Sequence, residues 1–126
     1  GHVLELLGHA DPPIPMAAEL HLNALPVLDG ALQTLQSGIQ SSLHAANRES
    51  QHVISNVTDF MHHPAFPLLF DPQTAGGLLA CVPPQQVSAC LYTLQEAGYC
   101  HASVIGCITA ASSHQPERIR LTGQVN

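Results

Sequence analysis

The sequence predicts a layered α/β domain in which helices pack on a mixed β-sheet. Apolar residues recur at helical spacing in some segments and at every second position in others, and the two kinds of segment interleave. Interleaved helices and strands favour a layered α/β fold over a helical bundle or a sandwich. The chain has 126 residues, 45% of them hydrophobic, which is enough for one core. We therefore expect a single domain over residues 1–126.

Four segments have the spacing of amphipathic helices: 2–9, 28–39, 53–61 and 84–97. Gly38 lies near the end of the second segment and Gly98 directly after the fourth, and each is followed by an apolar residue, which predicts a left-handed helix stop. The polar stretch between Gly38 and Asn47 predicts a loop or a helix cap, with Asn47 as the candidate cap residue.

The strands are predicted from two patterns. Apolar and polar residues alternate over 18–22 and 118–122, as in strands with one buried face, and residues 103–109 form a further strand candidate. The run 78–82 is apolar throughout and lies between two glycines and two prolines. Continuous apolar runs are typical of strands covered by other layers, so we expect 78–82 to be buried on both faces.

Charged residues are scarce, at 10% of the chain against ~25% in ordinary domains. Such a surface suggests that part of it is normally covered. The chain has no lysine, and Arg48, Arg118 and Arg120 stand against nine acidic residues. This balance excludes nucleic acid and anionic membranes as partners, and the missing lysine excludes a Walker-type phosphate loop and a Schiff-base mechanism within the chain. No 18-residue apolar stretch is present, so no membrane span is predicted.

The cysteines and histidines offer no obvious site. Cys81, Cys90, Cys100 and Cys107 form no C-x-x-C pair and lie in or beside apolar runs, so we expect buried free thiols in a reducing cytoplasm. Among the nine histidines, the pairs His62-His63 and Cys100-His101 lack metal-site spacing. We expect no native metal site and interpret the histidines as solvated or helix-terminal.

The turn 71–77, with sequence DPQTAGG, has unusual residue types for a simple connection. Asp-Pro favours a turn, Thr74 offers a hydroxyl, and adjacent glycines permit positive φ and close approach of a backbone to a ligand. Consecutive amides in such a turn can form a concave anion site. From the residues alone both a phosphate loop and a tight turn entering a strand remain open, and the tight turn is favoured.

The longer segment LLFDPQTAGGLLACVP resembles the LFDPQTSGGLL-type signature of selenophosphate synthetases, also called selenide, water dikinases. Further on, AGY at 97–99 and VIG at 104–106 resemble the turn and strand of that family, and GHVLEL at 1–6 resembles its GHLLEM sequence. The resemblance covers essentially the whole chain in the same order, and it is diffuse between about residues 10 and 64.

The resemblance implies that the chain is the C-terminal domain of a longer enzyme, with the fold found in relatives of aminoimidazole ribonucleotide synthetase. The whole enzyme would convert selenide, ATP and water to selenophosphate, AMP and phosphate with magnesium, and would be a cytoplasmic homodimer. An N-terminal ATP-binding domain outside this sequence would be the chain's partner and would hold most of the ATP and Mg²⁺ contacts. No catalytic residue and no metal ligand carries over, so the chain alone is expected to be inactive.

Four residues match the signature and would line a substrate or phosphate cleft between the two domains: Gln73, Thr74, Gly76 and Gly77. Ala75 stands where the family commonly has serine, which leaves the backbone amides and Thr74 as donors. Asp71 is interpreted as a turn cap rather than a metal ligand, and Arg48 as a surface residue rather than part of the cleft.

Two other classes stay open. The chain could be a non-catalytic ligand-binding or assembly module of the same fold, or a domain of a purine-pathway synthetase or a hydrogenase maturation protein. The DPQT sequence argues against the second.

Overall fold

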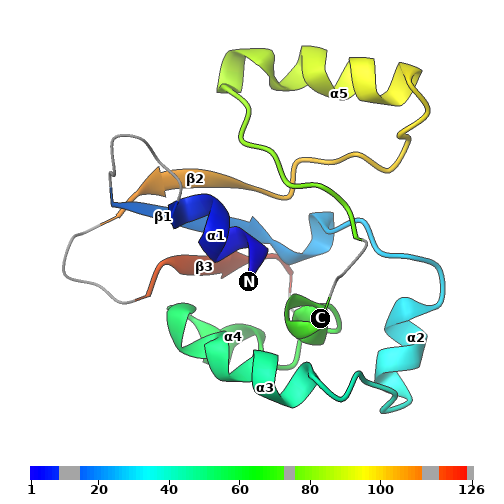
Figure 1. Cartoon of the computed structure of the whole chain (residues 1–126), viewed down its shortest axis with the longest axis vertical. Coiled ribbons are helices and arrows are strands. Elements are labelled where there is room, and N and C mark those ends of the chain that lie inside the picture. The colour runs from blue at the N-terminus through cyan, green and yellow to red at the C-terminus, as the bar shows by residue number, and fades with distance from the viewer. Residues whose placement is uncertain (9–14, 73–75, 112–116, 125–126) are drawn as a thin grey trace.

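The computed structural model has helices packed on a three-stranded mixed sheet, which confirms the α/β class (Figure 1). It describes residues 1–8, 15–72, 76–111 and 117–124. The α-helices are α1 His2–Gly8, α2 Ala31–Gln36, α3 His44–Arg48, α4 Val57–Phe60 and α5 Val87–Glu96. The strands are β1 Met16–His21, β2 Gly106–Ala110 and β3 Ile119–Thr122. Short 3-10 helices are η1 Leu22–Ala24, η2 Glu49–Val53, η3 Phe66–Phe70 and η4 Pro84–Gln86. No helix in the described part of the chain is long and apolar enough to cross a membrane.

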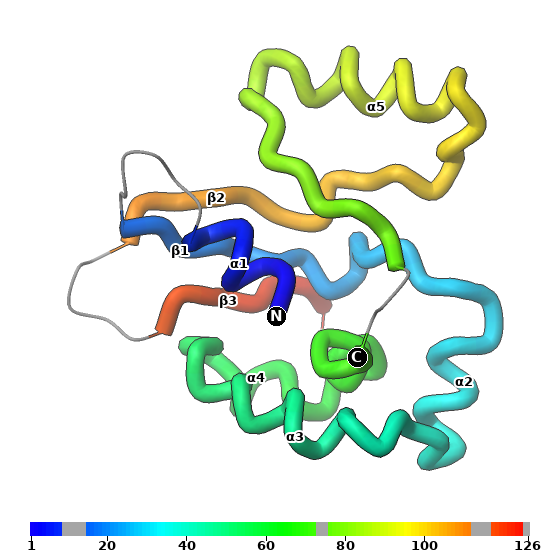
Figure 2. The backbone as a smooth tube through the Cα atoms, viewed as in Figure 1, coloured from blue at the N-terminus to red at the C-terminus, as the bar shows by residue number. Residues whose placement is uncertain are grey.

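Strand β1 lies at the centre of the sheet. The strand order is β2-β1-β3, with β2 antiparallel and β3 parallel to β1. The strands expected over 18–22 and 118–122 are therefore confirmed, with small shifts at their ends. The strand expected over 103–109 begins only at Gly106. Strand β1, drawn in blue, and strand β3, drawn in red, lie side by side although they are far apart in sequence (Figure 2).

The alternation of β1 separates the core from the surface. Ala18 and Leu20 are buried, whereas Glu19 is half-buried and His21 is exposed. The buried face contacts residues from α4, η3 and the sheet itself, and Val3 and Leu4 of α1 pack against the same cluster. The buried members are Leu20, Leu22, Ile54, Phe60, Ala65, Phe66, Phe70, Ile119 and Leu121. Each large apolar side chain buried here contributes about 1.5–3 kcal/mol, so this cluster is the main stabilising element.

Asn56 covers the outer edge of β3. Its Nδ2 donates to the Leu121 carbonyl at 2.9 Å, and its Oδ1 accepts from the Leu121 amide at 2.9 Å. Ile54 also forms a parallel bridge with Ile119. These bonds hold residues 54–56 against the strand edge, which is why the helix expected over 53–61 is reduced to Val57–Phe60.

Arg118 ties α1 to the sheet. Its guanidinium donates to the Leu7 carbonyl at 3.1 Å and to the Met16 carbonyl at 3.0 Å. Both bonds are partly buried, and bonds from a charged donor are among the stronger ones in proteins. Arg118 is thus a structural cation that fastens the N-terminal helix to the central strand.

The two glycine stops are confirmed. Gly38 has φ +77° and Gly98 has φ +95°. After each glycine, the amide of the next residue donates to the carbonyl five positions earlier. Ile39 donates to Thr34 at 3.1 Å, and Tyr99 donates to Leu94 at 2.9 Å. This is the Schellman arrangement, in which only glycine adopts the left-handed conformation at no steric cost.

Two helix expectations are corrected. The helix expected over 28–39 is only Ala31–Gln36, and Leu28, which precedes it, is 85% exposed. Asn47 is not a cap: it lies inside α3, and its side chain bonds to η3 instead of to a helix terminus.

The expectation that 78–82 is a buried strand is wrong for this structure. No residue over 76–83 is assigned to a strand, and Leu78 is 99% exposed. Among the described residues β2 pairs only with β1, so its other edge receives no partner from this segment. An apolar run indicates burial but does not identify the layer that covers it.

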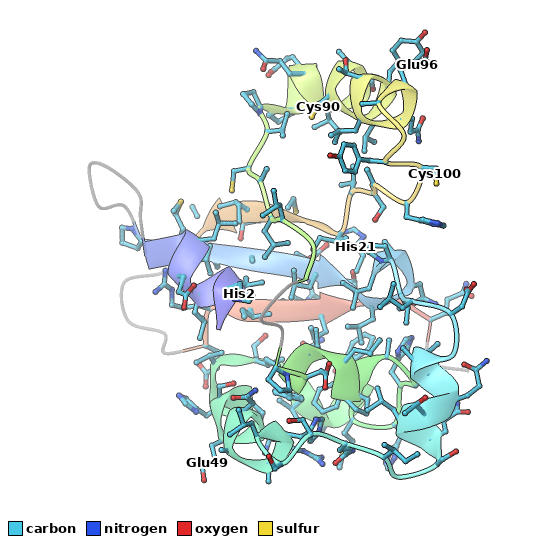
Figure 3. The ribbon with its side chains drawn as sticks, turned by 45° about the vertical axis from the view of Figure 1, so that its right-hand side comes forward. His2, His21, Glu49, Cys90, Glu96 and Cys100 are labelled. Atoms are coloured by element: carbon cyan, nitrogen blue, oxygen red, sulfur yellow. The ribbon has the colours of Figure 1, made fainter. Side chains whose placement is uncertain are left out.

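The expected helix over 84–97 is confirmed as η4 followed by α5, but it buries less than its pattern indicates. Four apolar residues form the predicted stripe and are only half-buried: Val87, Cys90, Leu91 and Leu94. Helix α5 stands away from the sheet in two views (Figures 1 and 3). No residue of α5 is buried, so much of its apolar side remains uncovered by the residues that the structure describes.

The cysteines are free thiols as expected, but they are not buried. Cys81, Cys100 and Cys107 are exposed and Cys90 is half-buried, because the segments that carry them are not covered by other described residues. Two histidines are buried rather than solvated, since His44 and His63 are 4% and 6% exposed, and His44 is helix-terminal, as the first residue of α3. His63 Nδ1 accepts the Ala65 amide at 3.1 Å, so it caps the chain entering η3.

Gly106 provides a test of the sheet. It faces Leu20 across the β1–β2 pair, and a Cβ at this position would collide with the backbone carbonyl of Glu19. We predict that Gly106→Ala lowers the free energy of unfolding by about 1–3 kcal/mol, as overpacking does elsewhere. Urea denaturation monitored by circular dichroism measures this change.

The matched control is Gly77→Ala, because no atom lies within 4 Å of a Cβ built there and its φ is not positive. This variant should stay within about 0.5 kcal/mol of the parent. Equal stability of the two variants would contradict the close packing of β2 on β1.

Candidate functional site

The signature segment begins in the core and continues at the surface. Phe66 and Phe70 of η3 are buried, at 1% and 4% exposure, and their rings contact edge to face with centroids 5.2 Å apart. Asp71 and Pro72 are half-buried. From Gly76 onward the backbone is exposed as far as the prolines that precede α5, apart from a half-buried Val82. The segment is therefore anchored at one end only.

The structure tests the expected cleft residues in part. Gln73 and Thr74, together with Ala75, lie outside the described residues, so their assignment stays a prediction. Gly76 and Gly77 are both exposed. Gly77 has open space around the position of a Cβ and does not use a positive φ. The structure therefore shows neither a steric nor a conformational requirement for glycine at this position, and its role in the cleft stays a prediction.

Helix α3 holds the start of the signature in place. Asn47 Nδ2 donates to the Phe70 carbonyl at 3.0 Å, in a partly buried bond between residues far apart in sequence. The His44 ring lies edge-on to Phe70, with centroids 6.2 Å apart and planes at 83°. His44 Nδ1 is buried and finds no hydrogen-bond partner among the described residues. Sequence reasoning missed both contacts, because nothing local relates α3 to η3.

The described residues offer little for phosphoryl transfer. The chain has no lysine, and Arg118 is engaged with the carbonyls of Leu7 and Met16. Arg120 lies 3.7 Å from Glu19 in a surface ion pair. Arg48 is exposed at the end of α3, as the surface interpretation expects, and its alternative place in a cleft stays untested. Phosphoryl transfer depends on cations placed around the phosphates, so we assign no reaction step to these residues.

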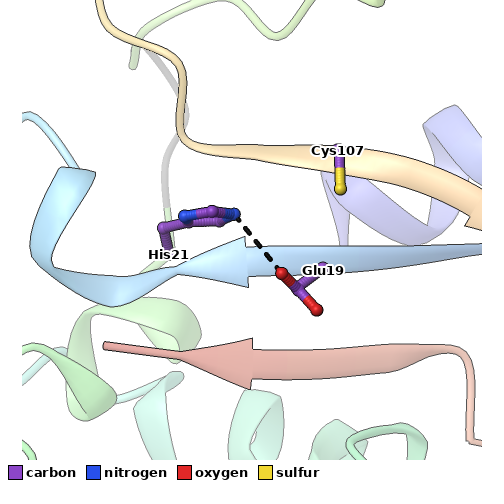
Figure 4. A group of neighbouring side chains, drawn as sticks. All are labelled: Glu19, His21 and Cys107. Carbon is purple, nitrogen blue, oxygen red and sulfur yellow. Dashed lines mark ion pairs between the residues drawn. The ribbon is translucent and has the colours of Figure 1, made fainter. Parts of the chain in front are cut away.

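One group of metal-ligating side chains is present in the described part of the chain: Glu19, His21 and Cys107 (Figure 4). Their ligand atoms all lie within 4.8 Å of one another, and His21 Nε2 is 3.6 Å from Glu19 Oε1. Magnesium prefers six oxygen ligands, so this mixed set does not fit it. The expectation that magnesium binds outside this chain therefore stays a prediction.

Sequence reasoning missed this group because it depends on strand register. Glu19 and His21 alternate with buried residues, which places them together on one face of β1. Cys107 joins them only because β2 pairs antiparallel with β1 and sets it opposite Glu19. The available signal was a cysteine in a predicted strand, without any indication of its neighbour.

The fold and site together define a class of protein: an α/β domain whose described residues present a glycine-rich turn and an apolar segment at the surface without a complete phosphate site of their own. Comparison with known proteins finds relatives named selenide, water dikinase. A selenide, water dikinase of Dechloromonas aromatica is 33% identical over 106 residues, which are 84% of this chain and 29% of that protein.

Two further relatives agree. A selenide, water dikinase of Nitratidesulfovibrio vulgaris is 33% identical over 98 residues, or 78% of this chain and 27% of the relative. A selenide, water dikinase of Pseudomonas straminea is 33% identical over 116 residues, which are 89% of this chain and 30% of that protein. No protein-family model matches the chain. The resemblance to selenide, water dikinases is thus confirmed over most of the chain, which spans less than a third of the length of these relatives.

The hydrogen bond from Asn47 to the Phe70 carbonyl predicts that its loss changes amide exchange next to Phe70. Asn47→Ala removes the donor to the Phe70 carbonyl, and the loss of one such bond costs about 0.5–1.5 kcal/mol. We expect the Asp71 amide, which donates to the Leu68 carbonyl at 3.2 Å, to exchange about fivefold faster, the factor that corresponds to ~1 kcal/mol. Amide hydrogen exchange followed by nuclear magnetic resonance measures it.

Ser50→Ala is the matched control, because Ser50 Oγ donates at 2.7 Å to the Asn47 carbonyl without reaching η3. Ser50→Ala should change amide exchange only in α3 and η2. If both variants leave exchange after Phe70 unchanged, α3 does not hold the signature segment.

Proposed function

We propose that the chain is the C-terminal domain of a selenide, water dikinase, and that the whole protein makes selenophosphate from selenide, ATP and water. The similarity to proteins of that name over 84% of the chain supports this proposal, as does the continuous match of its signature. A fold like that of the aminoimidazole ribonucleotide synthetase relatives, a cytoplasmic location and a homodimeric enzyme belong to the same proposal.

The observation that carries the proposal is the position of the signature at an uncovered surface. Leu78 is 99% exposed and Leu79 is 37% exposed, directly after the glycine pair. Contiguous exposed apolar residues mark sites where another protein surface binds. The same inference follows from the low proportion of charged residues, 10% of the chain. We propose that this segment faces an N-terminal ATP-binding domain of the same protein.

In this arrangement, Gln73, Thr74, Gly76 and Gly77 would line the cleft between the two domains. The open space around Gly77 supports this role, because a ligand could approach the backbone there. Amide groups of the turn and the Thr74 hydroxyl would donate to an anionic oxygen of the substrate or product. ATP and Mg²⁺ would be held mainly by the N-terminal domain, so this chain would shape the cleft.

The test is complementation of a bacterium that lacks selenophosphate synthetase with the whole gene. We predict that the gene restores selenium incorporation, and that Leu78→Asp in it lowers selenophosphate formation at least about tenfold. The physical reason is that a carboxylate at a covered apolar surface is desolvated without a partner.

Leu28→Asp is the control, since Leu28 is also largely exposed, at 85%, but lies outside the signature. It should retain the parental activity. Failure of the unaltered gene to complement would contradict the proposed enzyme, whereas equal activity of the two variants would contradict only the interface.

A further inference from the structure

We propose that Glu19, His21 and Cys107 form a zinc site on the exposed face of the sheet. The site is distinct from the cleft proposed above and does not depend on the enzymatic activity. Its three side chains come from two neighbouring strands (Figure 4). Each supplies a different donor: a carboxylate oxygen, an imidazole nitrogen and a thiolate sulfur.

The backbone of the sheet fixes the relative positions of the three residues. Glu19 and Cys107 are direct partners in the antiparallel pair of β1 and β2, and His21 lies two positions along β1 on the same side. Directly opposed residues in such a pair have Cβ atoms ~4.5–5.5 Å apart. The ligand atoms already lie within 4.8 Å of one another. Tetrahedral bonds of ~2.0–2.3 Å set donors roughly 3.3–3.8 Å apart, so only small side-chain rotations are needed.

The donor set selects the metal. Sulfur and nitrogen ligands suit zinc, whereas magnesium and calcium take oxygen ligands. Three protein ligands leave the fourth tetrahedral position for water or an exchangeable ligand. His21 and Cys107 are both exposed, which gives that position access to solvent.

Arg120 competes with a metal ion for the Glu19 carboxylate but does not prevent the ion from binding. Its guanidinium is 3.7 Å from Glu19 Oε2, on the side of β1 opposite Cys107, and its side chain is 68% exposed. Exposed ion pairs contribute about 0–1 kcal/mol, so the Glu19 carboxylate can turn to a divalent cation. Zinc would displace the Cys107 thiol proton, so its affinity should fall as the pH falls.

The test is calorimetric titration of zinc chloride into the purified chain with its thiols kept reduced. We predict one zinc per chain with micromolar or tighter affinity. Glu19→Gln, His21→Asn and Cys107→Ser should each weaken binding at least about tenfold, because changes to residues that merely support a ligand already cost 10–100-fold. Arg120→Gln should strengthen it.

The matched control is Cys100→Ser combined with His101→Asn, which removes another exposed thiol and imidazole from outside the sheet. It should bind zinc like the parent. Cobalt binding adds a second measurement, because a thiolate–cobalt charge-transfer band should appear in the parent and vanish in Cys107→Ser. Circular dichroism verifies that the variants are folded.

Three results would overturn the proposal. They are the absence of zinc binding by the parent chain, parental affinity in Cys107→Ser, and an equal loss in the Cys100–His101 control.

Discussion

The pairing of β1 on both of its edges is the constraint on which the rest of the described structure depends. It joins β2 antiparallel on one side and β3 parallel on the other. Its alternation turns Leu20 toward the helices and Glu19 away from them, so one six-residue strand defines both the core and the polar face. Gly106 lets β2 approach closely enough for this pairing. Arg118 and Asn56 then fasten α1 and the segment before α4 to the same sheet.

This core covers only part of the apolar residues that the chain contains. The signature contributes Phe70 to the buried cluster, whereas its later apolar residue Leu78 lies at the surface. Helix α5 shows the same imbalance, because its apolar stripe is half-buried and no residue of it is buried. In the proposed enzyme both features would lie against another domain. The sequence similarity and the uncovered surface thus support the same proposal from independent observations.

Local determinants explain what the sequence predicted correctly. The glycine stops at Gly38 and Gly98 need only a left-handed residue and its neighbours, and the alternation of β1 needs only a buried face. The buried strand over 78–82 was predicted wrongly because the pattern indicates burial without naming the covering layer. Asn56 and the Glu19, His21 and Cys107 group were missed because they depend on pairings between distant segments. The roles of Gln73 and Thr74 stay predictions, since they lie outside the described residues.

The central claim is that another part of the protein covers the exposed signature segment. Amide hydrogen exchange over residues 78–82, compared between this chain and the product of the whole gene, tests it most directly. We predict rapid exchange in the isolated chain, where Leu78 is exposed, and strong protection in the whole protein. Equally rapid exchange in both would contradict the account, because the segment would then have no covering partner.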